Sequence, residues 1–195
     1  FTGKAFASTT TSGSSALIVA LNALKIAKND EVIVPTYVCK SVLHAIRSVG
    51  AKEVLCDIGN SWVIDFVSVR SKISTKTKAI IAVHLFGVFV DCKELASFGV
   101  PIIEDCCQSL DRMGGRLLTS LSGDISIYSL HATKCLPVGE GGLIATNRKD
   151  LAESIEQFRE QNKNYFNLSD LNAALARSQL SNYNETLERR EEIAG

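Results

Sequence analysis

Apolar residues recur along this chain in two patterns that alternate from end to end. Short continuous apolar runs are typical of buried strands, and longer stretches with apolar residues three to four positions apart are typical of helices. The expected strands cover residues 31–35, 52–58, 78–85, 100–104, 124–130 and 142–146. The expected helices cover residues 15–27, 38–49, 67–73, 92–98, 149–161 and 169–192, and the polar stretch 161–167 predicts a mobile connection.

This alternation predicts an α/β fold with three layers, α/β/α. Strands that are apolar throughout and separated by helices indicate a mostly parallel central sheet covered on both faces. Ligands of such sheets bind at the carboxyl ends of the strands. We therefore expect the chemistry of this protein in the loops that directly follow its strands.

Composition excludes several classes of protein. The 195 residues are 46% hydrophobic and 22% charged, which is ordinary globular usage, and 21 basic residues balance 21 acidic ones. A zero net charge disfavours a nucleic-acid partner, and no apolar run is long enough to predict a membrane span. Six cysteines without C-x-x-C spacing, and only three histidines, predict no metal centre but buried, reduced thiols in a cytoplasmic protein.

Three segments could carry chemistry. Residues 10–15 place small hydroxyl residues and a glycine at the start of a helix, where backbone N–H groups bind phosphate, although a plain N-cap has the same composition. Asp105 ends an apolar strand, where a carboxylate meets a ligand or merely caps a turn. Lys134 follows another strand in a segment poor in charge, and is either a carbonyl nucleophile or a surface lysine.

Together these three features match the groups with which a protein binds pyridoxal phosphate. A lysine forms a Schiff base with the cofactor, a carboxylate keeps the ring nitrogen protonated, and a helix N-terminus with a serine such as Ser129 holds the phosphate. The glycines of residues 139–142 lack the G-x-G-x-x-G spacing of dinucleotide sites and precede a strand, which disfavours a Rossmann dehydrogenase.

Eight segments in order resemble the DegT/DnrJ-type nucleotide-sugar aminotransferases, which have the fold type I architecture of pyridoxal phosphate enzymes. They are SGSSAL (12–17), DEVIVPTYV (30–38), VGAKEVLCDI (49–58), TKAIIAVHLFG (77–87), VPIIEDCCQS (100–109), GDISIYSLHATK (123–134), GEGG (139–142) and NLSDLNAALARSQL (167–180). The resemblance covers nearly the whole chain, from about residue 10 to residue 194.

The resemblance implies roles for particular residues. Lys134 would be the Schiff-base lysine and proton shuttle, and Asp105 would pair with the ring nitrogen. Gln108 would contact the ring hydroxyl, and the phosphate ligands would be Ser14, Ser15 and Ser129.

The resemblance also implies features beyond these ligands. Asn167 would reach the phosphate in the neighbouring subunit, which implies a homodimer with shared active sites. Cys39 stands where many relatives place an aromatic ring over the cofactor, so the stacking residue is open. His84 is expected to shape the pocket without doing chemistry, and Glu140 to help position the loop after Lys134.

The implied function is transfer of an amino group, with glutamate as the expected donor, to a nucleotide-linked keto sugar of the kind used in polysaccharide biosynthesis. Residues 1–165 would form the cofactor-binding large domain, and residues 166–195 a helical segment that leads to a small C-terminal domain absent from this chain. Two alternatives remain open, a sugar dehydratase and a truncated relative that does not turn over. Some relatives that dehydrate sugars carry histidine in place of the lysine, so Lys134 favours amino transfer.

Overall fold

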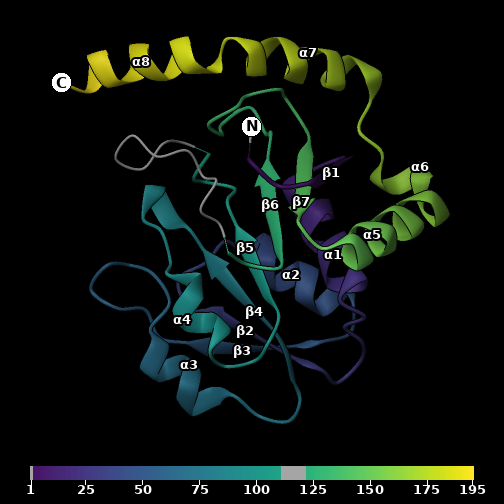
Figure 1. Ribbon diagram of the computed structural model, residues 1–195, viewed down its shortest axis with the longest axis vertical. Coiled ribbons are helices and arrows are strands. Elements are labelled where there is room, and N and C mark those ends of the chain that lie inside the picture. The colour runs from purple at the N-terminus through teal and green to yellow at the C-terminus, as the bar shows by residue number, and fades with distance from the viewer. Residues whose placement is uncertain (1, 111–121) are drawn as a thin grey trace.

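A seven-stranded sheet forms the centre of the protein, whose structure, a computed structural model, describes residues 2–110 and 122–195 (Figure 1). The strand order is β1-β7-β6-β5-β4-β2-β3. The strands β2 to β6 are parallel to one another, and β7 runs antiparallel to its neighbours β6 and β1. Their bounds are β1 Phe6–Thr10, β2 Glu31–Pro35, β3 Lys52–Cys56, β4 Thr77–Val83, β5 Ile102–Asp105, β6 Ile125–Ser129 and β7 Gly142–Thr146.

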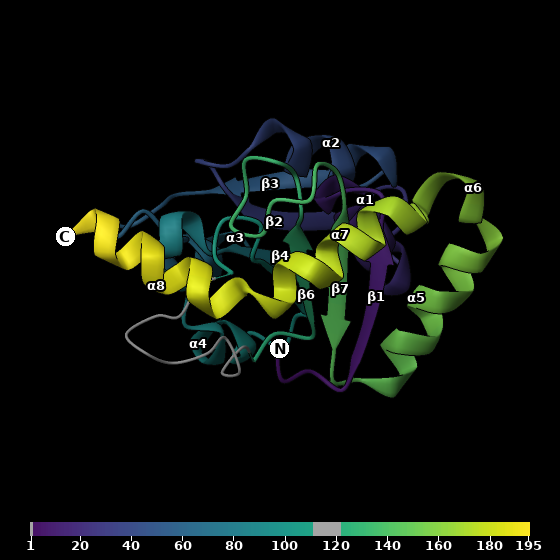
Figure 2. The ribbon, with the colours of Figure 1, turned by 90° about the horizontal axis from the view of Figure 1, so that it is seen from above.

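Helices cover both faces of the sheet. The helices α1 (Gly13–Ala23), α2 (Lys40–Ser48) and α5 (Lys149–Gln161) contribute to the core on one face, and α3 (Phe66–Lys72) and α4 (Cys92–Ala96) to the core on the other. Two later helices, α7 (Asp170–Ser181) and α8 (Tyr183–Ala194), form a long arm across one end of the sheet (Figure 2). Tyr183 and Leu187 of this arm are buried against residues of the segment after β6.

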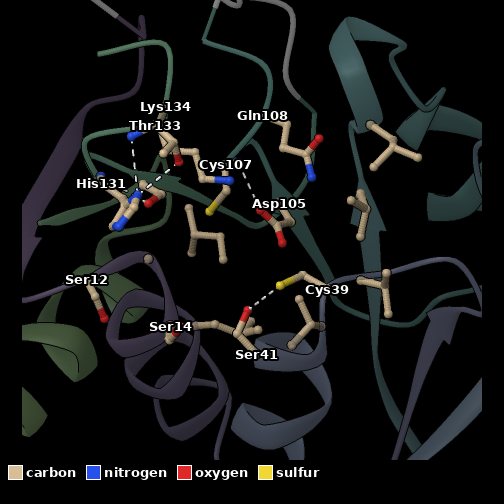
Figure 3. A pocket seen from close by; sticks show the side chains of 18 of the residues that line it. Ser12, Ser14, Cys39, Ser41, Asp105, Cys107, Gln108, His131, Thr133 and Lys134 are labelled. Carbon is tan, nitrogen blue, oxygen red and sulfur yellow. Dashed lines mark hydrogen bonds between the residues drawn. The ribbon is translucent and has the colours of Figure 1, made fainter. Parts of the chain in front are cut away.

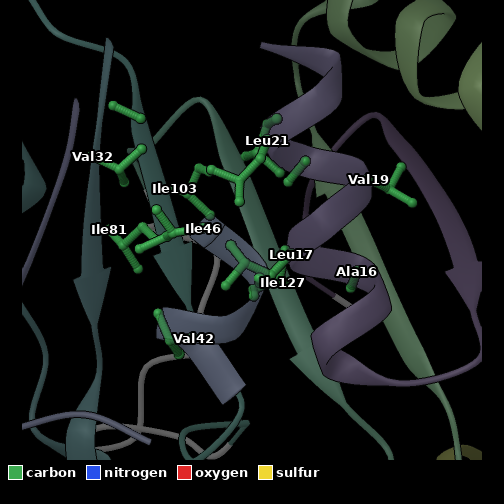
Figure 4. Packing of buried hydrophobic residues seen from close by; sticks show 14 of the residues in the cluster. Ala16, Leu17, Val19, Leu21, Val32, Val42, Ile46, Ile81, Ile103 and Ile127 are labelled. Carbon is green, nitrogen blue, oxygen red and sulfur yellow. The ribbon is translucent and has the colours of Figure 1, made fainter. Parts of the chain in front are cut away.

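The strand β4 shows why continuous apolar runs predict this sheet. Ala79 and Ile81 face the α1 and α2 side, whereas Ile80 and Ala82 face the α3 and α4 side (Figure 4 shows the first side). All four side chains are fully buried. Because successive side chains point to opposite faces, a strand covered on both faces must be apolar at every position.

Most predicted elements are confirmed, and the fold class is the one that the pattern predicts. The strands at 31–35 and 142–146 and the helix at 149–161 have the predicted bounds. The first helix begins earlier than expected, directly after its N-cap Ser12. It also ends earlier, at Ala23, because Lys25 adopts a φ of 57°, which a right-handed helix does not allow. The prediction of a single helix over residues 169–192 is wrong, since Asn182 separates α7 from α8. The stretch 161–167 contains a short helix, α6 (Lys163–Phe166).

The strand β1 has no counterpart among the predicted elements. Its sequence, FASTT, is mostly small and polar, and all its residues except the buried Thr10 are at least partly exposed. It pairs with β7, more than 130 residues away in sequence, through a register that joins Thr10 to Gly142. This strand delivers the chain to the start of α1.

The expectation of buried cysteines is confirmed in part. All six are free thiols, and Cys56, Cys92 and Cys106 are buried. Cys39 is exposed and contradicts the expectation, while Cys107 and Cys135 are half-buried. Among the described residues, no helix combines the length and the apolar character that a membrane span requires.

Replacing Gly142 by alanine should destabilise the protein. A Cβ there would lie 2.2 Å from the Ser12 carbonyl oxygen, so the chain entering α1 would have to move. We expect Gly142→Ala to lower the free energy of unfolding by about 1–3 kcal/mol, as overpacking typically does. Urea unfolding measures this, and Gly59→Ala is the control because its Cβ would meet no atom closer than 3.9 Å. Equal stability of the two variants would contradict the prediction.

Candidate active site

A pocket of about 350 Å³ lies between the N-termini of α1 and α2 and the carboxyl ends of β4, β5 and β6 (Figure 3). Five of the predicted site residues line it, namely Ser14, Asp105, Gln108, Ser129 and Lys134. They come from three separate segments of the chain, and the fold brings them together. The pocket also has apolar walls, to which Leu17, Val83 and Ile127 contribute.

The sheet places Asp105 at the edge of this pocket. Asp105 is the last residue of β5, and its register partners are Val83 of β4 and Ile127 of β6. Its side chain is buried, and Oδ1 accepts a hydrogen bond from the Cys107 backbone N–H at 2.9 Å. The carboxylate also lines the pocket, with the Cys107 thiol as a neighbouring side chain. A buried carboxylate that lines a pocket suits a ligand that presents an N–H group.

Lys134 lies on a closed loop that follows β6. The Lys134 backbone N–H donates to the His131 carbonyl at 2.8 Å, and the Ala132 N–H donates to Gly139 at 2.9 Å. The Val138 N–H donates back to the Leu130 carbonyl at 2.9 Å. These bonds fold the loop onto itself, so the half-buried Lys134 is held at the pocket by a short, braced segment.

The N-terminus of α1 forms the opposite side. Ser12 is the N-cap, and its Oγ accepts from the Ser15 N–H at 3.1 Å. The N–H groups of Gly13 and Ser14 have no hydrogen-bond partner in the part of the chain that the structure describes. A Cβ at Gly13 would lie only 2.9 Å from the Ser129 Cβ, so the absence of a side chain lets the helix start beside Ser129. Free N–H groups at a helix N-terminus, with hydroxyl groups nearby, suit a phosphate.

Two predicted site residues do not line this pocket. The Ser15 hydroxyl is hydrogen-bonded to those of Thr11 and Ser12. Asn167 is exposed, and its Oδ1 accepts from Arg159 at 3.4 Å. The roles of all seven residues remain predictions, and Ser15 and Asn167 are the two that this pocket does not bring together with the others.

Sequence patterns did not single out Ser41, Cys107 or Thr133, which also line the pocket. Cys39 lines it too, at the N-cap of α2, where its Sγ accepts from the Ser41 hydroxyl at 3.1 Å. This hydrogen bond, with the Ser41 backbone N–H, lowers the pKa of the Cys39 thiol. Burial, by contrast, raises the pKa of Cys107. The Asp-x-Cys spacing of residues 105–107 was the one available signal for Cys107, because an aspartate often accepts from the N–H two residues on.

A histidine expected to shape the pocket lies behind it instead. His84 is not among the lining residues, and it forms a fully buried cluster with Glu104 and Cys106 whose potential metal-ligand atoms lie within 4.8 Å of one another. The Val90 N–H donates to His84 Nδ1 at 3.1 Å, so the proton of the ring is on Nε2. That Nε2–H faces Glu104 Oε2 at 2.8 Å, which indicates a hydrogen-bonded pair and not a metal ligand.

With this geometry established, comparison with known proteins identifies the family. The DegT/DnrJ/EryC1/StrS aminotransferase family matches residues 1–195. This chain belongs to that family. Membership makes it a relative of pyridoxal-phosphate-dependent sugar aminotransferases, as the resemblance in its sequence predicts.

Three relatives define the extent of the similarity. The GDP-perosamine synthase of Escherichia coli O157:H7 is 32% identical over 206 residues, covering 97% of this chain and 57% of that protein. The UDP-N-acetyl-3-dehydro-alpha-D-glucosamine 3-aminotransferase of Acidithiobacillus ferrooxidans is 34% identical over 155 residues, covering 76% of this chain and 42% of that protein. The crystal structure of NtdA from Bacillus subtilis with bound cofactor PMP matches with a TM-score of 0.81 and 28% identity. This match covers 90% of the present chain and 44% of the NtdA chain. The chain thus spans about half the length of the curated relatives.

The exposed thiol in the pocket of this family member should be the most reactive of the six. We expect iodoacetamide to label Cys39 first, because a lowered pKa increases the thiolate fraction, whereas burial raises the pKa of Cys56 to about 12. Ser41→Ala should move the midpoint of the labelling rate to higher pH. Peptide mass mapping over a pH series measures this, with Ser48→Ala on the same helix as the control. Unchanged labelling in Ser41→Ala would refute the assignment.

Proposed function

We propose that this chain is the cofactor-binding part of a pyridoxal-phosphate-dependent aminotransferase that acts on a nucleotide-linked keto sugar. The observation that supports this most is the convergence of Asp105, Lys134 and the free N–H groups of α1 on one pocket. Family membership supports the same reaction class, and the NtdA structure holds PMP, the aminated form of this cofactor. We also propose that the cofactor-binding large domain ends at about residue 165 and that the helical segment after it begins at residue 166.

The pocket residues fit the cofactor at both ends. Asp105 would accept a hydrogen bond from the ring nitrogen, and Gln108 would contact the ring hydroxyl. The N–H groups of Gly13 and Ser14, with the Ser14 and Ser129 hydroxyls, would hold the phosphate. Ser15 would contribute through the helix start and not from the pocket wall.

When bound, pyridoxal phosphate supplies an aldehyde that exchanges amino groups and a ring that accepts electrons. Lys134 would hold the aldehyde through its ε-amino group. The same amine would take a proton from the carbon next to nitrogen and return it, as a general base and acid. The Asp105 carboxylate would keep the ring nitrogen protonated, which is the condition under which that carbon loses its proton readily.

The substrate classes come from the relatives and from the resemblance. Both curated relatives have names that include a nucleotide-linked sugar, which supports such an acceptor here. We propose glutamate as the amino donor. We also propose a homodimer in which the exposed Asn167 reaches the cofactor phosphate of the neighbouring subunit.

Replacing Lys134 by alanine should abolish covalent attachment of the cofactor. We expect borohydride reduction of the whole natural protein with pyridoxal phosphate to leave an adduct on the Lys134 peptide, and no adduct there in Lys134→Ala. Lys149→Ala is the control, because Lys149 is exposed on α5 and pairs with Glu153. An adduct on another lysine in the wild type, or unchanged transamination in Lys134→Ala, would refute the assignment. Product analysis that shows loss of a hydroxyl without gain of nitrogen would favour a dehydratase.

Replacing Asp105 by asparagine should weaken cofactor binding without unfolding the protein. The amide keeps the size of the side chain and its bond to the Cys107 N–H but removes the charge. We expect the Kd for pyridoxal phosphate to rise about tenfold or more, since a hydrogen bond to a charged group contributes about 1.5–3 kcal/mol. Absorption titration measures the Kd, and an unchanged value would exclude Asp105 as the partner of the ring nitrogen.

A further inference from the structure

Directly behind Asp105 lies a buried hydrogen-bonded pair that the proposed chemistry does not use. His84 follows β4, and Glu104 precedes Asp105 on β5. Their side chains are 0% and 1% exposed, and Nε2 of His84 lies 2.8 Å from Oε2 of Glu104. Because successive side chains of a strand alternate, Glu104 points to the sheet face opposite to Asp105.

Every strong acceptor in this pair is already engaged by a buried donor. Glu104 accepts from the His84 ring through Oε2 and from the Gly123 backbone N–H through Oε1. His84 Nδ1 accepts from the Val90 N–H. A Cβ at Gly123 would lie 2.6 Å from Oε1, so the carboxylate fills the space in front of this glycine. The pair thereby joins the ends of β4 and β5 to the loop after β4 and to the segment before β6.

The backbone of His84 extends this network to the pocket. The His84 N–H donates to the Asp105 carbonyl at 3.0 Å, which is the last bond of the β4–β5 ladder. The Ser109 hydroxyl donates to the His84 carbonyl, and it accepts from the Gly87 N–H at 3.1 Å. Ser109 follows Gln108, so the network constrains both residues proposed to contact the cofactor ring.

We propose that His84 and Glu104 are positioning residues that hold Asp105 and Gln108 in place for the cofactor. The inference rests on the proposed function, because it acts through the residues that would contact the ring. Its physical basis is the cost of a buried N–H without an acceptor. If Glu104 loses one acceptor, the Gly123 N–H or the His84 ring N–H must find another partner, and the strand ends beside Asp105 must shift.

The test compares cofactor affinity with stability. Glu104→Gln keeps the shape of the side chain but places an NH₂ group against one of the two donors. We expect the Kd for pyridoxal phosphate to rise about tenfold in the whole natural protein. The matched control is Thr77→Val, which removes a buried hydroxyl that accepts from the Ser74 N–H at 3.0 Å at the start of β4. This control should lower stability in urea and leave the Kd unchanged.

A double-mutant cycle separates positioning from general loss of stability. If Glu104 acts through Asp105, Glu104→Gln should raise the Kd much less when Asp105 is already asparagine. Additive effects would overturn the proposal, as would a Kd in Glu104→Gln equal to that of the control. If Glu104→Gln does not fold, Ser109→Ala replaces it in the cycle, with the same criterion.

Cofactor binding by the wild-type protein separates failure of the proposed function from failure of the positioning role. A wild-type protein that does not bind pyridoxal phosphate would overturn the proposed function and the positioning role with it. A wild-type protein that binds the cofactor while Glu104→Gln binds it equally well would overturn the positioning role alone.

Discussion

Because β4, β5 and β6 are paired in parallel, Val83 and Asp105 lie side by side where β4 and β5 end, with Ile127 of β6 next to Asp105. Helices cover both faces of this sheet, so its strands present functional groups at their ends and not on their faces. The rest of the site depends on that constraint. Asp105 is buried at the edge, and the loop after β6 turns back with Lys134 toward the same edge.

The second side of the site depends on close approaches that only glycine permits. Gly13 lets the N-terminus of α1 lie against Ser129 of β6, and Gly142 lets the chain entering α1 lie against β7. The partial positive charge at the start of α1 is thereby directed into the pocket opposite Asp105. Sheet and helix together give a pocket with an acceptor on one side, donors on the other and apolar walls between them.

The sequence predicts the elements that are buried on both faces, because burial leaves an apolar run that local pattern detects, as in β4. It does not predict β1, since this polar strand exists only through its pairing with the distant β7. Asp105 and Lys134 are predictable because the edge of a parallel sheet follows from the order of elements. The sequence does not predict the acceptor roles in the His84–Glu104 pair or the hydrogen bond between Ser41 and Cys39. These features depend on contacts that only the folded chain defines.

The buried pair also shows why a site of this kind needs support on both faces of the sheet. A carboxylate such as Asp105 binds its ligand well only if it already has the required orientation when the ligand arrives. On the pocket face, the Cys107 N–H donates to Oδ1 and so restricts the orientation of the carboxylate. On the other face, Glu104 and His84 tie β5 to its neighbours within one residue of Asp105. The precision of the proposed cofactor contact therefore depends on polar groups that the cofactor would never touch.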